Sequence, residues 1–367
     1  MLSWTRDYNK LLLLAVFVLS AFSLAMIYSA TNAVSYTAGY FTRHLGNLLV
    51  GVIVMLLLTI LDYHAFEAWV LPLYIVTLGL LAIVLLLGLV SSGAQSWLNF
   101  GLRTFQPSEP AKLLVIFALA AYWSRFARES NTWRVLLGSL LLVGIPTLMV
   151  FLQPDFGTAM VFGAVWIAMA WTAGSRPIHL LAVFAAAIPV AIVGWTEVLQ
   201  DYQRNRLLIF IDPVKYDPDL QNGAWNIIQS LSAITAGGAW GQGWLQGAIS
   251  QSNTLPVQYS DFIFAVIGEE LGFAGAGLLL MFLVLLLWQS IDVAAAAHDT
   301  FGRLIAVGIA AMFGCHILVN VGMNMSMMPI TGIPLPFVSY GGSFTLTALA
   351  AVGVLQSIAL RRRMIAF

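Results

Sequence analysis

The stretch Leu11–Ala30, LLLLAVFVLSAFSLAMIYSA, contains no charged side chain. A helix of about 20 residues crosses the roughly 30 Å hydrocarbon core of a bilayer, so this stretch is long enough to span a membrane. Arg6 and Lys10 precede it, as they would precede the apolar region of a signal peptide. The stretch is too long for such a region and has no small-residue cleavage site, so we expect a retained first span.

The rest of the chain has the same apolar character. Of its 367 residues, 60% are hydrophobic and 9% are charged, and the mean hydropathy is +0.90. This composition differs strongly from that of soluble domains, and it predicts an all-α polytopic membrane protein with a single domain, residues 1–367. The ten apolar runs expected to span the membrane are 11–31, 46–62, 68–90, 109–124, 135–152, 158–174, 179–198, 262–289, 304–323 and 343–360.

The distribution of basic residues predicts the orientation of these spans. An even number of spans places both termini on one side, and ten of the sixteen Lys and Arg residues then share that side. Basic residues accumulate on the cytoplasmic side, so both termini are expected there. The long connection between spans seven and eight, residues 199–260, is then extracytoplasmic. Within it, a repeat of apolar residues at helical spacing predicts an amphipathic helix at the membrane surface: Trp225, Ile228, Leu231 and Ile234.

Several classes of function are excluded by what the sequence lacks. The formal net charge is zero, which gives no field to attract nucleic acid. The chain has no phosphate-binding glycine loop and no H-E-x-x-H pair, so we expect no organic cofactor. Cys315 is the only cysteine, which excludes an intrachain disulfide. Its neighbour His316 is predicted to be a hydrogen-bonded core residue rather than a metal ligand.

Ionisable residues at the outer mouths of the spans are the candidates for a functional site. A charge in lipid costs free energy, so such residues usually face a cavity. Asp261, beside Ser260 at the start of span eight, has two interpretations: a helix cap or a general base. Lys112 also has two, a salt bridge with Glu109 or a partner for an anionic head group.

Two more carboxylates, Glu269 and Glu270, follow Asp261 closely in the sequence. On a helix they would lie about 12 Å deeper than Asp261 and away from its face. We therefore predict that they form a structural link to another helix and are not catalytic. Farther on, the Pro and Gly residues of 330–343 predict a broken helix or ordered turn at the mouth of the last span.

Seven motifs occur in order along the chain: RTFQPSEPAKL (103–113), LQPDFGTAMV (152–161), DYQRNRLLIFIDP (201–213), WNIIQSLSAI (225–234), GWLQG (243–247), SDFIFAVIGEELG (260–272) and GIPLPFVSYGGS (332–343). Together they closely resemble the SEDS family of bacterial cell-wall proteins, over nearly the whole chain. The motifs YQRNRLLIFIDP and IIQS are more similar to the elongation branch of that family than to its division branch.

The resemblance implies a peptidoglycan glycosyltransferase that polymerises lipid II at the outer face of the bacterial cytoplasmic membrane, together with a class B penicillin-binding protein. It implies that Asp261 is the catalytic aspartate. We assign binding of the substrate and its pyrophosphate to Lys112, Arg43, Arg103, Glu109 and Asp155. A divalent cation, Mg²⁺ or Mn²⁺, is left open as a cofactor. A lipid II transporter and a division-type member of the family are left open as the alternative functions.

The chain departs from the family pattern just before Asp261. Relatives commonly have Glu and His where this chain has Val257 and Tyr259. Roles that depend on those two side chains therefore do not transfer to this protein.

Overall fold

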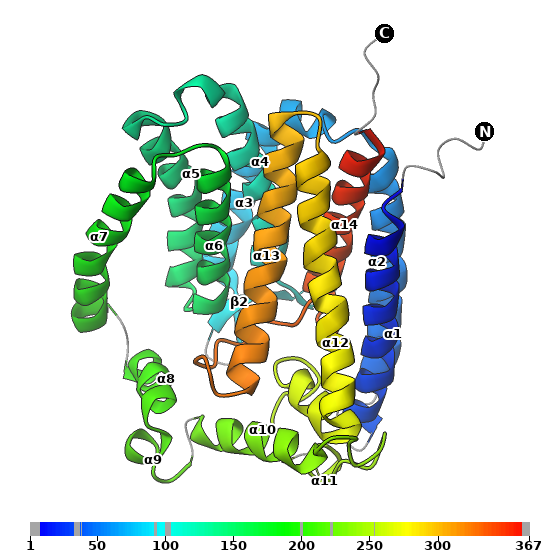
Figure 1. The fold of residues 1–367 in the computed structure, drawn as a ribbon. Helices are drawn as coiled ribbons and strands as arrows, with labels where there is room; N and C mark the ends of the chain where they lie inside the picture. Colours follow the sequence, from blue (N-terminus) through cyan, green and yellow to red (C-terminus); the bar gives the residue numbers. More distant parts are fainter. Residues whose placement is uncertain are drawn as a thin grey trace.

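Long helices packed side by side make up most of the molecule (Figure 1). The computed structural model describes residues 8–32, 37, 39–91, 94–99, 104–198, 201–220, 223–252 and 254–361. The helices of the bundle are α1 (Lys10–Asn32), α2 (Tyr40–Ile60), α3 (Ala65–Leu87), α4 (Ser108–Arg125), α5 (Trp133–Leu152), α6 (Phe156–Thr172), α7 (Pro177–Val193), α12 (Ile263–Ala296), α13 (Thr300–Asn324) and α14 (Gly342–Arg361).

Each of the ten predicted spans coincides with one of these helices. Among the described residues, eight helices are long and apolar enough to cross a membrane. The other two are α6, which has 17 residues, and α4, which carries Glu109, Lys112 and Arg125. Both lie inside the bundle beside the other helices (Figure 1). The prediction of an all-α polytopic membrane protein is confirmed.

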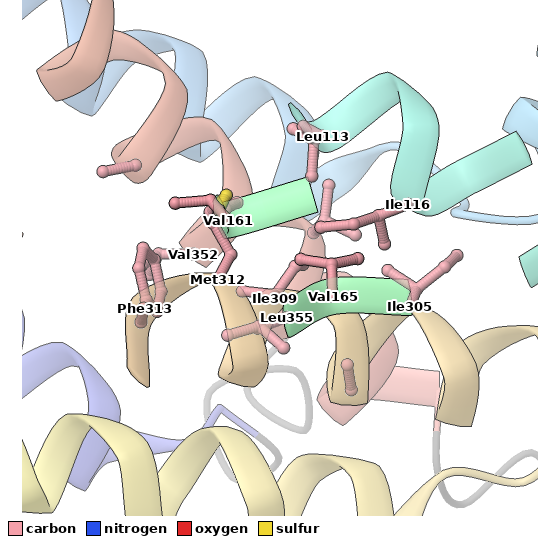
Figure 2. Packing of buried hydrophobic residues seen from close by; sticks show 14 of the residues in the cluster. Leu113, Ile116, Val161, Val165, Ile305, Ile309, Met312, Phe313, Val352 and Leu355 are labelled. Carbon is pink, nitrogen blue, oxygen red and sulfur yellow. The ribbon is translucent and has the colours of Figure 1, made fainter. Parts of the chain in front are cut away.

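Helix α13 packs at the centre of the apolar core (Figure 2). Its residues Ile305, Ile309, Met312 and Phe313 are fully buried against side chains of α4, α6 and α14, among them Leu113, Ile116, Val161, Val165, Val352 and Leu355. The outer faces of the bundle are also apolar. Phe17 on α1 is 72% exposed and Trp288 on α12 is 68% exposed, as expected for faces that contact lipid.

Both ends of the described chain lie at one end of the bundle, which we call the terminal end. The backbone N–H of Asn9 donates to Gln356 Oε1 at 3.0 Å, and Gln356 Nε2 donates to the Asn9 carbonyl at 2.9 Å. The start of α1 and the end of α14 are therefore bonded to each other, in agreement with the prediction that both termini lie on one side. The short connections α2–α3 and α12–α13 also meet here, where the Tyr63 hydroxyl donates to Asp299.

The opposite end of the bundle contains a small antiparallel sheet that was not predicted from the sequence. Its strands are β1 (Leu89–Ser91), β2 (Ala94–Asn99) and β3 (Thr104–Phe105), in the order β1-β2-β3 between α3 and α4. Leu89 pairs with Trp97, and Leu98 pairs with Phe105. The sequence of β2, AQSWLN, does not alternate between apolar and polar residues, and strands this short give a weak periodic signal in any case.

The long connection between α7 and α12 is largely helical. A π-helical turn, Gly194–Val198, extends α7, and four helices follow: α8 (Asp201–Ile211), α9 (Pro213–Tyr216), α10 (Ala224–Gly237) and α11 (Ala248–Gln251). The predicted amphipathic helix is α10. It buries Ile227 and Ser230 but leaves Trp225, Ile228 and Leu231 each 37% exposed, an apolar outer face suited to a membrane surface.

Candidate active site

A cavity of about 1310 Å³ opens at the end of the bundle opposite the termini. Its walls come from segments far apart in the sequence: the first turns of α2, the sheet and the start of α4, the α5–α6 turn, the segment before α12 and the segment before α14. Four of the six site residues predicted from the sequence line this one cavity, namely Arg43, Glu109, Asp155 and Asp261.

Asp261 lies in the turn that leads into α12, and its backbone is held from both sides. Its N–H donates to the Val257 carbonyl at 3.1 Å, and its carbonyl accepts from the amides of Asn320 at 3.1 Å and Asn324 at 3.0 Å. The carboxylate accepts a hydrogen bond from Ser260 Oγ, 2.9 Å from Asp261 Oδ1.

The capping role that was one interpretation of Asp261 belongs to another residue. The N-cap position of α12 is Phe262, which makes no side-chain cap bond. The backbone N–H of Ala265, in the first turn, instead donates to Asn324 Oδ1 at 3.1 Å. Asp261 is therefore not the N-cap residue of α12, and it lies on the wall of the cavity.

Gly332 borders the Asp261 carboxylate. Its φ is +73°, and a Cβ at this position would lie 3.3 Å from Asp261 Oδ2. The left-handed backbone and the close approach both favour glycine. The surrounding segment has no regular helix, which confirms the predicted break before the last span. Two further bonds join this segment to the Asp261 turn: Ser339 Oγ donates to Ser260 O at 2.6 Å, and Tyr340 N–H donates to Tyr259 O at 2.9 Å.

Aromatic side chains form the wall of the cavity next to Arg43. Tyr40 and Tyr340 stack with their ring centroids 4.9 Å apart, and Tyr259 packs edge-on against both rings. The Arg43 guanidinium lies 6.0 Å from the Tyr40 ring centroid, and this arginine is exposed. Tyr259, one of the residues that depart from the family pattern, thus packs into the wall beside the aspartate.

Asp155 caps helix α6. Its carboxylate accepts from the Thr158 backbone N–H at 3.0 Å and from Thr158 Oγ1 at 2.9 Å. Gln106 Nε2 donates to the same carboxylate at 3.1 Å, which joins the α5–α6 turn to the start of α4. A capped helix start with a carboxylate on the cavity wall provides a fixed negative group there.

Lys112 and Glu109 form the predicted salt bridge, which is confirmed at 2.8 Å between Nζ and Oε2. Both side chains are buried. Glu109 lines the cavity but Lys112 does not, because its ammonium points into the protein. There it lies 3.0 Å from His316 Nε2 and 5.3 Å from the Phe344 ring centroid.

His316 connects this ion pair to the cavity wall. Its Nδ1 lies 2.9 Å from the Pro334 carbonyl, which can only accept, so the ring proton is on Nδ1. Nε2 is then the acceptor for the Lys112 ammonium. The imidazole is neutral in this arrangement, and the prediction that it is a hydrogen-bonded core residue is confirmed.

Glu269 and Glu270 lie away from the cavity and are fully buried. Glu269 accepts from the backbone N–H groups of Ile249 at 2.7 Å and Ser250 at 2.9 Å. Glu270 accepts from Ser29 Oγ on α1 at 2.5 Å. The predicted structural link is confirmed: the pair joins α12 to α1 and to the segment around α11. Arg103, the remaining predicted site residue, lies outside the described residues.

Comparisons with known proteins agree with the motifs. Residues 9–364 match the FtsW/RodA/SpoVE family of cell cycle proteins. The chain belongs to this family. The peptidoglycan glycosyltransferase MrdB of Escherichia coli K12 is 36% identical over 366 residues, covering 99% of this chain and 96% of its own. The probable peptidoglycan glycosyltransferase FtsW of Trichlorobacter lovleyi is also 36% identical, over 96% of this chain and 93% of its own.

Two solved structures share the fold of this chain. One is the structure of a peptidoglycan synthase complex that coordinates polymerization and crosslinking. It contains a chain 30% identical to this one, with a TM-score of 0.81 and full coverage of both chains. The rod shape determining protein RodA of Thermus thermophilus is 26% identical, with a TM-score of 0.71 and 98% coverage of both chains. The chain described here is a multi-pass membrane protein, as its apolar helices also indicate.

Three polar residues on α13 contact the site, although none of them was predicted as a site residue. His316, Asn320 and Asn324 follow one another at intervals of four, so they lie along one face of the helix, and all three are fully buried. Polar side chains at this spacing inside an apolar span were the available signal, because they are costly in lipid and mark functional positions.

The side chains around the cavity offer few ligands for a metal ion held by the protein alone. Among the described residues, no three His, Cys, Asp or Glu side chains converge as a metal site would require. Within the cavity, the oxygens of Asp155 already accept from Thr158 and Gln106. The residues that the structure describes therefore do not fit a dedicated metal centre.

Proposed function

We propose that this protein is a peptidoglycan glycosyltransferase that polymerises lipid II at the outer face of the bacterial cytoplasmic membrane. The observation that carries the proposal is the placement of Asp261 and Arg43 on the wall of one 1310 Å³ cavity, at the end of the bundle opposite the termini. A base and a cation beside a cavity of this size suit the transfer of a sugar from a phosphorylated donor. The lipid tails of both substrates would remain in the bilayer.

In the proposed reaction, Asp261 accepts the proton of the 4-hydroxyl group of the acceptor GlcNAc. The hydroxyl oxygen bonds to C1 of the donor MurNAc, the bond from C1 to the pyrophosphate oxygen breaks, and undecaprenyl pyrophosphate leaves with the electron pair. General-base assistance of this kind contributes about 10²–10⁴-fold to a rate. Arg43 offsets the negative charge that grows on the leaving group.

The other predicted binding residues take different places in this proposal. Glu109 and Asp155 contribute to the wall that orients the sugars. Lys112 stabilises the wall from behind, since its ammonium neutralises the buried Glu109. Arg103 keeps its proposed role in binding pyrophosphate on the basis of its place in the sequence alone.

A divalent cation fits this site only as an ion that the substrate brings with it. Mg²⁺ is commonly bound by one or two carboxylates together with substrate phosphates, and Asp261 could supply one carboxylate. No step of the proposed reaction depends on such an ion.

The proposal extends to the partner and the cellular role. We infer that the protein works with a class B penicillin-binding protein that crosslinks the glycan strands, and the likeness to a peptidoglycan synthase complex supports this. We place it in cell elongation because of its elongation-type motifs. Relatives named MrdB and FtsW match with the same identity, so overall identity does not separate the elongation and division branches.

The deciding experiment supplies lipid II to the purified protein and its partner in detergent, where there is no membrane for a transporter to act across. Glycan strands should form, and Asp261→Asn should abolish them. Asp292→Asn, the same charge change at an exposed position near the other end of α12, is the matched control and should polymerise normally. Polymerisation by Asp261→Asn at the normal rate would refute the catalytic assignment, and absence of polymer from the unmodified protein would favour a lipid II transporter.

A further inference from the structure

We propose that Asn320 positions Asp261 for the proposed reaction, an inference that rests on the proposed function. Asn320 is fully buried in α13. Its Nδ2 lies 3.1 Å from the Asp261 carbonyl and 2.8 Å from the Ile333 carbonyl. Carbonyl oxygens can only accept, so Nδ2 donates one hydrogen to each, and this fixes the orientation of the amide.

Asn324, one turn farther along α13, supplies a second donor to the same carbonyl. Its Nδ2 lies 3.0 Å from the Asp261 carbonyl and 2.8 Å from the Asn320 carbonyl, and its Oδ1 accepts from Ala265 N–H. The Asp261 carbonyl therefore accepts two hydrogen bonds, one for each lone pair. With the Asp261 N–H bound to Val257, little freedom is left in the backbone that carries the carboxylate.

The position of Ile333 gives Asn320 its particular role. Ile333 directly follows Gly332, the residue that borders Asp261 Oδ2. A single carboxamide thus joins the segment that carries the carboxylate to the segment that faces it. Asn320 therefore sets the space beside the carboxylate, where the acceptor hydroxyl must approach.

A buried amide elsewhere in the protein provides a matched control. Gln356 is 1% exposed, and it also makes two hydrogen bonds to backbone groups, at 3.0 and 2.9 Å, both with Asn9. These bonds lie at the terminal end of the bundle, far from the cavity. Replacing either amide with leucine removes two buried hydrogen bonds from the fold, but only Asn320→Leu changes the setting of Asp261.

The test measures lipid II polymerisation and thermal unfolding of the full-length protein with its partner in detergent. We expect Asn320→Leu to lower kcat by about 10²-fold with KM changed less than about threefold, because a misplacement of about 1 Å costs a rate of this order. Gln356→Leu should lower the melting temperature to a similar extent and leave kcat unchanged.

Three outcomes would overturn the inference. One is a normal kcat for Asn320→Leu, and another is an equal loss of kcat in Asn320→Leu and Gln356→Leu. If the leucine variant does not fold, Asn320→Asp replaces it, since this variant keeps the shape but at most one of the two donors, and a normal kcat there is the third. Asp261→Asn separates the two proposals: if it is inactive while Asn320 variants are unimpaired, only the positioning role fails, and if it is fully active, both proposals fail.

Discussion

The ammonium of Lys112 lies 2.8 Å from the Glu109 carboxylate, and both side chains are shielded from solvent. Removing one partner of a buried ion pair leaves the other charge without compensation, which costs about 3–5 kcal/mol. We expect Lys112→Met to lower the melting temperature in detergent strongly, and Glu109→Gln with Lys112→Met to recover most of the loss. Lys215→Met, at an exposed lysine, is the control and should change little. A Lys112→Met protein as stable as the wild type would contradict the importance of the pair.

Gly332→Ala should impair polymerisation more than it impairs folding. The substitution places a Cβ 3.3 Å from Asp261 Oδ2 and adds strain at a φ of +73°. We expect the rate to fall by about 10- to 100-fold, because crowding displaces the carboxylate. The control Gly238→Ala also has a positive φ, +55°, but its Cβ would meet no atom within 4 Å, so it should keep the normal rate. Equal rate losses in both variants would point to backbone strain alone.

The environment of Tyr63 predicts that the folded protein becomes less stable at alkaline pH. Burial, together with the hydrogen bond to the Asp299 carboxylate, raises the pKa of Tyr63 well above its ordinary value. The stabilisation is complete below the pKa of about 10 that the residue has when unfolded, and it is lost as pH rises above that value. The melting temperature should therefore fall as the pH is raised through the unfolded-state pKa of about 10, roughly from pH 9.5 to 11. In Tyr63→Phe this part of the decline should disappear, and an unchanged pH profile would contradict the assignment.

Glu270→Ala should destabilise the segment between α10 and α12 without changing the chemistry. The substitution leaves donors from Ser29, Ser250 and Gln251 without their shared acceptor. Each buried group left unsatisfied costs about 1–3 kcal/mol. Limited proteolysis should cut the segment around α11 faster, while kcat per folded molecule stays normal. Glu67→Ala, at an exposed glutamate of α3, is the control. A large loss of kcat in intact protein would show that Glu270 is more than a structural link.

The sequence was a reliable guide wherever a residue's role follows from its own segment. Apolar runs predicted the bundle helices because spanning a bilayer requires a fixed length of apolar helix. The Glu109–Lys112 pair was predicted because residues three apart are neighbours on a helix. The short sheet between α3 and α4 was missed, since strands of two to six residues carry little periodic signal.

The sequence by itself determined a membrane-spanning helical bundle and, through its resemblance to the family, the candidates Asp261, Arg43, Glu109 and Asp155. Only the tertiary structure decided what these residues contact. Packing of α13 against the segments before α12 and α14 places Asn320 between the Asp261 and Ile333 carbonyls. The physical reason is that a buried amide is satisfied by whichever groups the fold brings to it, and those groups are 59 and 13 residues away in the sequence.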